Sequence, residues 1–295
     1  MTMLRRMALF LATNLAVLVL LGIVLSVLQG VFGVQLGNDG TLLVFAAIFG
    51  FGGSIISLLM SKTLAKRSTG AQVITQPRNE VERWLFGTVQ RQAATLGLKM
   101  PEVAIYDAPE INAFATGASR NNSLVAVSTG LLRAMNRDEA EAVLGHEMSH
   151  VANGDMVTMA LIQGVLNTFV IFLSRIVGRM LDAALSGNRN DDRPGFFYYI
   201  IVMVLDLVFG LFASIIAMAF SRWREFRADA GGARLAGTPK MIAALERLAL
   251  NQGQSTLPAQ IRAFGISGGM AHGLRRLMLS HPPLGERIEA LRRAG

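Results

Sequence analysis

The sequence predicts a mainly α-helical membrane protein with four transmembrane helices and a cytosolic α+β domain that contains a small β-sheet. Of its 295 residues, 52% are hydrophobic and 16% are charged, whereas soluble domains carry about 25% charged residues. The mean hydropathy is +0.44. Four long apolar runs are separated by segments with short strand patterns and amphipathic helical patterns, so a folded domain accompanies the membrane spans.

The net charge of +8 fits a membrane protein better than a nucleic-acid-binding one. No basic stretch carries interleaved aromatic residues, and most Arg and Lys residues lie beside the apolar runs, as in cytoplasmic flanks of transmembrane helices. The chain has no cysteine, so disulfides and thiolate metal ligands are excluded. We therefore expect no nucleic-acid partner, and any zinc must be held by His and carboxylate side chains.

The first two apolar runs form a transmembrane hairpin within residues 1–61. Each run, at 7–28 and at 41–61, approaches or exceeds the about 20 residues that cross a bilayer. The first run is longer than the about 7–15 apolar residues of a signal peptide, and no Ala-x-Ala site follows it, so a retained anchor is expected. Lys and Arg flank the hairpin and are absent between its spans. The positive-inside rule then places the N-terminus, and the chain after residue 62, in the cytoplasm.

Residues 62–155 are predicted to form the first part of the cytosolic domain. It begins with a polar linker over 62–78 and an amphipathic helix over 79–97, where apolar residues recur at helical spacing. The β-branched and apolar stretches that follow are typical of strands. The expected strands are at 103–106, 111–117 and 123–128, with a polar turn at 118–122.

The next helix carries the motif on which the functional interpretation rests. Asn136 and Glu139 form a capping-box pattern at its start, and an Asn-Gly pair is expected to end it. Inside it lies the sequence His-Glu-Met-Ser-His. Positions i and i+4 share a helix face, so His146 and His150 can ligate one metal ion. Glu147 can then take a proton from a metal-bound water. A chance pair of surface histidines is the alternative.

A second hairpin within residues 156–220 completes the four predicted spans. Its apolar runs are at 156–173 and 196–220, with a polar loop over 182–195. An ionisable residue inside a span is costly and often functional. Because Asp206 has no evident charged partner in the spans, a packing or helix-contact role is expected for it.

Residues 221–295 are predicted to complete the cytosolic domain. Glu225 and Asp229 lie four residues apart on a segment with helical character, so they share one face. Glu225 can be the third metal ligand, and Asp229 can accept the N–H of a ligand histidine. A solvated charge run at the membrane surface is the alternative. The remaining elements are a helix from Thr238, a Gly-rich loop over 251–273 and a final helix after His281.

Four motifs of the chain recur together in one family. They are His146-Glu-Met-Ser-His150 with Asn153-Gly-Asp155, Asn112-Ala-Phe-Ala-Thr-Gly117, Arg224-Glu-Phe-Arg-Ala-Asp-Ala230 and Ser280-His-Pro-Pro-Leu-Gly-Glu-Arg-Ile288. Together they resemble the HtpX membrane zinc metalloproteases, which share a clan with the CAAX prenyl endopeptidases. The resemblance covers the whole chain and implies a zincin-like metalloprotease domain. It implies one zinc ion per chain, held by His146, His150 and Glu225, with Glu147 as general base and Asp229 beside a ligand histidine.

The resemblance also implies substrates and a location. The family cuts misfolded or damaged membrane proteins, and some soluble ones, in membrane quality control and the stress response. A multi-pass protein of the bacterial inner membrane is expected, with a cytosolic active site at the lipid surface. The expected partners are polypeptide substrates and the lipid bilayer, and self-association is left open.

Two groups of residues are candidates for substrate handling. An exposed strand edge pairs with a peptide backbone, and either Asn112, Ala113, Phe114 and Ala115 or residues 123–128 could supply it. An ordinary core hairpin is the alternative. His281 and Arg287 are candidates for stabilising the oxyanion, and the histidine also for capping the zinc in a resting state. A simple cap of the last helix is the alternative for both.

Two other functions are compatible with the sequence. A non-proteolytic membrane assembly factor could hold a structural zinc, but such a site needs no base at Glu147. A small transporter could use Asp206 and Arg175, but no internal repeat and no pair of broken helices supports this.

Overall fold

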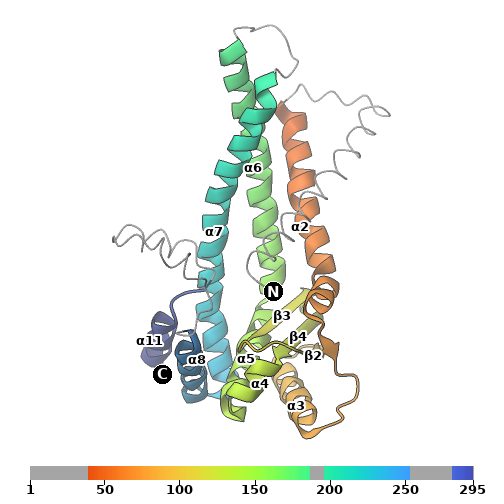
Figure 1. The fold of residues 1–295 in the computed structure, drawn as a ribbon, viewed down its shortest axis with the longest axis vertical. Coiled ribbons are helices and arrows are strands. Elements are labelled where there is room, and N and C mark those ends of the chain that lie inside the picture. The colour runs from red at the N-terminus through yellow and green to blue at the C-terminus, as the bar shows by residue number, and fades with distance from the viewer. Residues whose placement is uncertain (1–38, 187–195, 253–280, 295) are drawn as a thin grey trace. The chain divides into compact units, whose positions relative to one another are not determined.

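The computed structural model of the chain describes residues 39–186, 196–252 and 281–294 (Figure 1). Its internal contacts divide it into two units. Unit 1 comprises Met1–Ser57 and Ala160–Ala217, and unit 2 comprises Leu58–Met159 and Met218–Gly295. The predicted first span, at residues 7–28, lies outside the described residues, as does most of the predicted Gly-rich loop.

Long apolar helices make up the described part of unit 1. Three helices have the length and composition to cross a membrane: α2 (Asp39–Thr69), α6 (Asp155–Ser186) and α7 (Phe196–Ala236). Many of their large apolar side chains are exposed, with Leu207 at 76%, as expected for surfaces that face lipid rather than water. The chain is therefore a mainly α-helical membrane protein.

Small residues allow the helices of unit 1 to pack closely, as is common between membrane helices. A Cβ atom at Gly50 of α2 would lie 2.7 Å from the carbonyl oxygen of Gly164 in α6. Farther along, Arg175 Nη1 of α6 lies 3.5 Å from Asp206 Oδ1 of α7. The expectation that Asp206 lacks a charged partner is therefore wrong, because Arg175 reaches it across the helix pair.

Unit 2 contains a four-stranded mixed sheet in the order β1-β2-β4-β3. Strands β2 and β4 are parallel, and the two outer pairs are antiparallel. The strand bounds are β1 (Gln72–Val73), β2 (Glu102–Tyr106), β3 (Ala113–Ser119) and β4 (Asn122–Ser128). Strand β4 pairs with β2 on one side and with β3 on the other, so residues 123–128 have no free edge. The alternative that this segment pairs with substrate is wrong, and β3 is an edge strand.

Helices cover one face of the sheet and form the main core of unit 2 (Figure 1). Leu85 and Val89 of α3 (Glu80–Thr95) and Leu144 of α5 (Arg137–Asn153) are almost fully buried against β2 and β4. A second cluster joins α5 to α8 (Thr238–Gln252) and α11 (Leu284–Ala294). The predicted helices at 79–97, from Asn136, from Thr238 and after His281 are thus confirmed. The short helix α4 (Thr129–Ala134) was not predicted.

Two predicted boundaries are wrong for the same reason: a polar segment continues a membrane helix. Residues 62–69, expected in a polar linker, extend α2 until Gly70 takes a positive φ of 68°. The segment that carries Glu225 was expected to follow a membrane span that ends at residue 220, but it is part of α7, which runs unbroken to Ala236. Neither segment contains proline, and both carry good helix formers such as Lys, Arg, Ala and Leu. The two glycines in the α7 segment, Gly231 and Gly232, lie where α7 packs closely against α5 and do not end the helix. Likewise, α6 extends into the predicted loop to Ser186.

Candidate active site

Helix α5 places two histidines on one face of unit 2. Its capping box is formed as predicted: the Asn136 side chain accepts from the Glu139 backbone, and the Glu139 side chain accepts from the Asn136 backbone. The helix ends at Gly154, which takes the left-handed conformation with φ 69°. With both ends fixed, His146 and His150 lie one turn apart, and their ring nitrogens Nε2 are 3.1 Å from each other.

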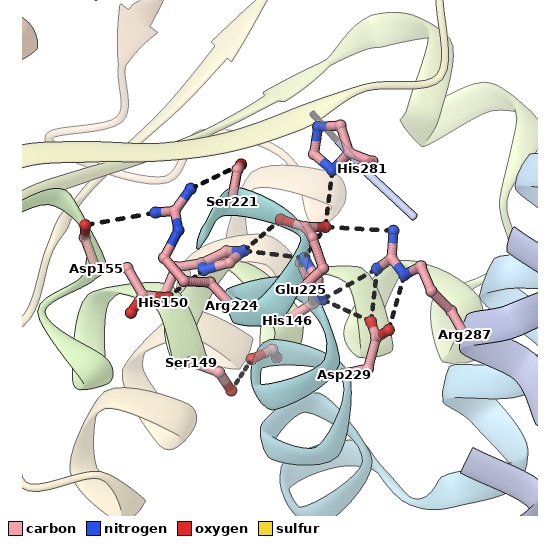
Figure 2. A network of polar contacts seen from close by, with 11 residues as sticks. His146, Ser149, His150, Asp155, Ser221, Arg224, Glu225, Asp229, His281 and Arg287 are labelled. Atoms are coloured by element: carbon pink, nitrogen blue, oxygen red, sulfur yellow. Dashed lines mark hydrogen bonds and ion pairs between the residues drawn. The ribbon is translucent and has the colours of Figure 1, made fainter. Parts of the chain in front are cut away.

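Helix α7 crosses α5 at close range and adds two carboxylates. A Cβ atom at Gly145 of α5 would lie 3.2 Å from the Cα of Gly232 in α7. This approach brings Glu225 beside the histidines: its Oε1 is 3.4 Å from His150 Nε2, and its Oε2 is 3.6 Å from His146 Nε2 (Figure 2). Glu225 is buried, with 2% of its surface exposed. The structure thus brings together all three predicted ligands.

The spacing of these three side chains fits a tetrahedral metal site. Zinc binds His nitrogen and carboxylate oxygen at about 2.0–2.2 Å, so tetrahedral ligand atoms lie about 3.3 Å apart. The distances of 3.1, 3.4 and 3.6 Å in this group bracket that value. In the described part of the chain, His146, His150 and Glu225 are the group of His and acidic residues whose ligand atoms could hold one ion. The donor set therefore fits the metal.

Two aspartates fix the orientation of the histidine rings. Asp229 Oδ1 lies 2.9 Å from His146 Nδ1, and Asp155 Oδ2 lies 2.6 Å from His150 Nδ1. A ring that donates through Nδ1 keeps the lone pair of Nε2 free. Both free lone pairs then face the carboxylate of Glu225, which is the arrangement a cation requires.

Both histidines are stronger bases than a free imidazole. Burial lowers the pKa of His150, but the hydrogen bonds to Asp155 and Glu225 outweigh it and raise this pKa to about 9. Burial likewise lowers the pKa of His146, while Asp229 and Glu225 raise it above its ordinary value. Metal binding to such a site releases protons.

Arg287 and His281 approach the site from the C-terminal segment. Arg287 is buried and forms two hydrogen bonds with Asp229, at 2.7 Å from Nε to Oδ2 and 2.6 Å from Nη2 to Oδ1. His281 is 64% exposed, and its Nδ1 lies 2.8 Å from Glu225 Oε2. The same oxygen also lies 3.3 Å from Arg287 Nη1 (Figure 2). Positive and nitrogen-bearing side chains around a buried carboxylate favour its ionised form, which is the form that ligates a metal.

Glu147 follows the first histidine on α5 and is half-buried. Its negative charge acts on His146, His150 and Arg287, so it lies close to the site. Among the described residues, no hydrogen-bond partner of its carboxylate is found. A free carboxylate beside a metal site can accept a proton from water.

The edge strand β3 packs against α5, the helix that carries the histidines. The Ser128 N–H donates to the Asn112 carbonyl, which sets the alternation of the antiparallel pair. In such a ladder every second residue turns its backbone groups away from the partner strand. Ala113 and Ala115 therefore direct their N–H and C=O groups to the free edge, where a peptide could pair with them.

Sequence reasoning missed Asp155 and Arg224 as parts of the site. Asp155 stands five residues after His150 and begins α6; from the sequence it was named only as the end of the Asn-Gly-Asp motif and was given no role. Arg224 precedes Glu225 and looked like part of a membrane-flanking charge run. The sequence signal for Asp155 was the glycine before it. Gly154 takes the left-handed conformation and turns the chain back toward His150.

Comparison with known proteins supports the same kind of site. The model of peptidase family M48 matches residues 79–294. A Protease HtpX of Xanthomonas campestris pv. campestris (strain B100) is 72% identical over 290 residues, 98% of both chains. Another, of Xanthomonas oryzae pv. oryzae (strain MAFF 311018), is 70% identical over 292 residues, 99% of this chain and 98% of the relative.

The crystal structure of S. mikatae Ste24p has a similar fold. It matches 98% of this chain with a TM-score of 0.65 and 20% identity, and the chain spans 65% of the length of that protein. This likeness concerns the fold alone, whereas the family model and the relatives concern the sequence. The chain belongs to peptidase family M48, a family of metal-dependent proteases.

Proposed function

We propose that this membrane metalloprotease is a zinc endopeptidase that cuts misfolded or damaged membrane proteins, and some soluble ones, from the cytosolic side of the bacterial inner membrane. The observation that carries the proposal is the convergence of His146, His150 and Glu225 within the distances of a tetrahedral site. The donor set supports zinc, since nitrogen and carboxylate ligands in tetrahedral geometry suit that ion. The relatives carry the name Protease HtpX.

In this mechanism the protein supplies the general base and orients the histidine ligands, and the metal would supply positive charge. Zinc in this site would polarise the peptide carbonyl and make water more acidic. Glu147 takes the proton of the attacking water and delivers it to the leaving amine. Asp229 and Asp155 keep both histidine rings turned toward the ion.

Of the two candidates for oxyanion stabilisation, His281 suits the role better. Its ring is mostly exposed beside Glu225, so a donor nitrogen can meet a substrate. The Arg287 guanidinium is buried between Asp229, which its Nε and Nη2 bind, and Glu225, which lies 3.3 Å from its Nη1. These contacts suit an arginine that holds the two carboxylates in place. The same position would allow His281 to cap the metal in a resting state.

Membrane attachment supports a site near lipid headgroups. Helix α6 begins at Asp155, two residues after the histidine helix ends, and the segment of α7 with Glu225 continues from a membrane span. Basic residues follow the apolar parts of two membrane helices along the chain, among them Lys62 in α2 and Arg222 and Arg227 in α7. Positive flanks face the cytoplasm, which supports a cytosolic site.

Metal removal tests the proposed activity. Purified protein in liposomes, given an unfolded protein substrate, is treated with a chelator and then with Zn²⁺ or Mg²⁺. Cleavage should stop on chelation and return with zinc but not with magnesium, because a nitrogen-containing site disfavours that hard ion. Cleavage that persists after the metal is removed would contradict the proposal. Tight zinc binding without any cleavage would favour a structural zinc in an assembly factor.

Substrate pairing with β3 is a separate part of the proposal. Ala115→Pro removes one outward N–H, and proline is tolerated on edge strands at such positions. The specificity constant for an unfolded substrate should fall, while zinc affinity should not change. Ala115→Ser, which keeps the N–H, serves as the control. Equal activity of the two variants would show that β3 does not pair with the substrate.

A further inference from the structure

A buried carboxylate holds the second histidine as Asp229 holds the first. Asp155 is 2% exposed, and its Oδ2 lies 2.6 Å from His150 Nδ1 (Figure 2). The sequence motif and the family match assign ligands and base, but they leave this residue without a role. Asp155 is also the first residue of α6, a membrane-spanning helix.

The contact decides which nitrogen of His150 can bind a metal. A carboxylate accepts a hydrogen bond, so Nδ1 carries the proton and Nε2 keeps its lone pair. That Nε2 lies 3.4 Å from Glu225 Oε1 and 3.1 Å from His146 Nε2. Without Asp155 the ring could turn or change tautomer, and the lone pair would leave the ligand group.

An arginine of α7 holds the start of α6 in place. Arg224 Nη1 lies 3.4 Å from the backbone carbonyl oxygen of Asp155, and Nη2 lies 3.1 Å from Ser221 Oγ (Figure 2). The opposite charges of Arg224 and Asp155 attract each other as well. Each ligand histidine therefore has a carboxylate partner. Arg287 binds the carboxylate of Asp229, whereas Arg224 binds the backbone of Asp155.

We propose that Asp155, held by Arg224, is the positioning residue of His150, so that zinc affinity depends on the first residue of a membrane helix. The inference rests on the proposed zinc site. This positioning role differs from the ordinary effect of an acid near a helix N-terminus. Any acidic residue in a first turn stabilises its helix through the helix dipole, whereas only Asp155 fixes the tautomer of His150.

The test compares zinc affinity in three variants of the full chain. Asp155→Ala removes the carboxylate, and Asp155→Asn keeps a hydrogen-bond acceptor of the same shape without the charge. Asp138→Ala removes another first-turn acid, which is exposed at the start of α5 and pairs with Lys240. Affinity is measured by competition with a chelator, and the site geometry by the visible spectrum of the Co²⁺-loaded protein.

Losing a carboxylate that orients a ligand histidine typically lowers metal affinity about 10- to 100-fold, and this is the loss expected for Asp155→Ala. Asp155→Asn should lose about tenfold or less by the same measure, and its Co²⁺ spectrum should shift. Asp138→Ala should bind zinc like the wild type. If Asp155→Ala does not fold, Asp155→Asn decides the question.

Unchanged affinity and an unchanged spectrum in the Asp155 variants would overturn the inference. Equal losses in the Asp138 and Asp155 variants would do the same, since they would point to helix stability alone. If the wild type itself failed to bind zinc, the proposed function would fail rather than this inference.

Discussion

The buried carboxylate of Asp229 stays ionised because Arg287 pairs with it. Its side chain is 2% exposed, and Arg287, at 7%, meets it with two hydrogen bonds. A paired and hydrogen-bonded carboxylate is tolerated inside a protein, but an unpaired one costs several kcal/mol. Burial lowers the pKa of Arg287, but Asp229 outweighs it and raises this pKa above its usual range, so the pair stays charged.

Arg287→Gln should therefore destabilise the protein strongly. The substitution leaves the Asp229 carboxylate buried without its bidentate partner, at an expected cost of about 3–5 kcal/mol. Thermal or denaturant unfolding in detergent would measure it. Arg293→Gln is the control on the same helix, because Arg293 is 80% exposed and pairs with Glu289. A loss as small as that of the control, within about 0.5 kcal/mol, would contradict the structural role of the buried pair.

At the scale of elements, the site depends on how closely α5 and α7 approach. A Cβ atom at Gly231 of α7 would lie 2.7 Å from Ser149 Cβ of α5, which no rotation of the serine can relieve. The three ligands are divided between these two helices, so their separation sets the size of the metal site.

Gly231→Ala should push the helices apart and weaken zinc binding, although residue 231 touches no ligand. Chelator competition on the zinc-loaded variant would measure the change. Gly285→Ala is the matched control, since a Cβ at Gly285 would meet nothing within 4 Å. That change should be neutral or slightly stabilising, because alanine favours helices. Equal zinc affinity in the two variants would show that the crossing does not control the site.

The attachment of α2 to the sheet should depend on pH. Lys62 Nζ and Lys66 Nζ lie 2.8 and 3.0 Å from the Glu102 carboxylate of β2. Burial raises the pKa of Glu102, but the two lysines outweigh it and hold this pKa below its usual value. The stabilisation is therefore complete above the unfolded pKa of about 4.3 and is lost as the pH falls through the lower folded pKa.

The Glu102→Gln variant should lack this acid-dependent part of the stability. About a third of the Glu102 side chain is exposed, and water screens the charges, so the difference should be about 1 kcal/mol or less. Thermal unfolding at pH 7 and at pH 3 would reveal it: the variant should be less stable at pH 7, and the two proteins should converge in acid. A constant difference at both pH values would argue against the ion pairs.

Local patterns in the sequence predicted much of this architecture. The capping pair Asn136 and Glu139 placed α5, and the spacing of its histidines placed two candidate ligands on one face. The order of the strands could not be predicted from local patterns, because the parallel pairing of β2 with β4 joins residues about 22 positions apart and depends on packing. The role of Asp155 was missed for a related reason, since it arises from the turn at Gly154 and not from helical spacing.

At the scale of the whole molecule, the proposed topology places both parts of unit 2 on the cytosolic side. The chain contains no cysteine, so labelling of a single introduced cysteine shows which side of the membrane that position faces. Gln76→Cys lies in unit 2, and Asn190→Cys lies between α6 and α7. In spheroplasts, a membrane-impermeant maleimide should label position 190 directly and position 76 only after the membrane is opened. The reverse pattern would overturn the proposed orientation.

The central claim is that a metal ion and Glu147 together hydrolyse peptide bonds. The most direct test compares wild type with Glu147→Gln, both loaded with zinc and checked for metal content, on an unfolded protein substrate. General-base catalysis contributes about 10²- to 10⁴-fold, so the variant should keep its zinc and lose at least about a hundredfold in rate. Equal cleavage by two zinc-loaded proteins would contradict the account, because a free carboxylate next to the metal would then have no part in the reaction.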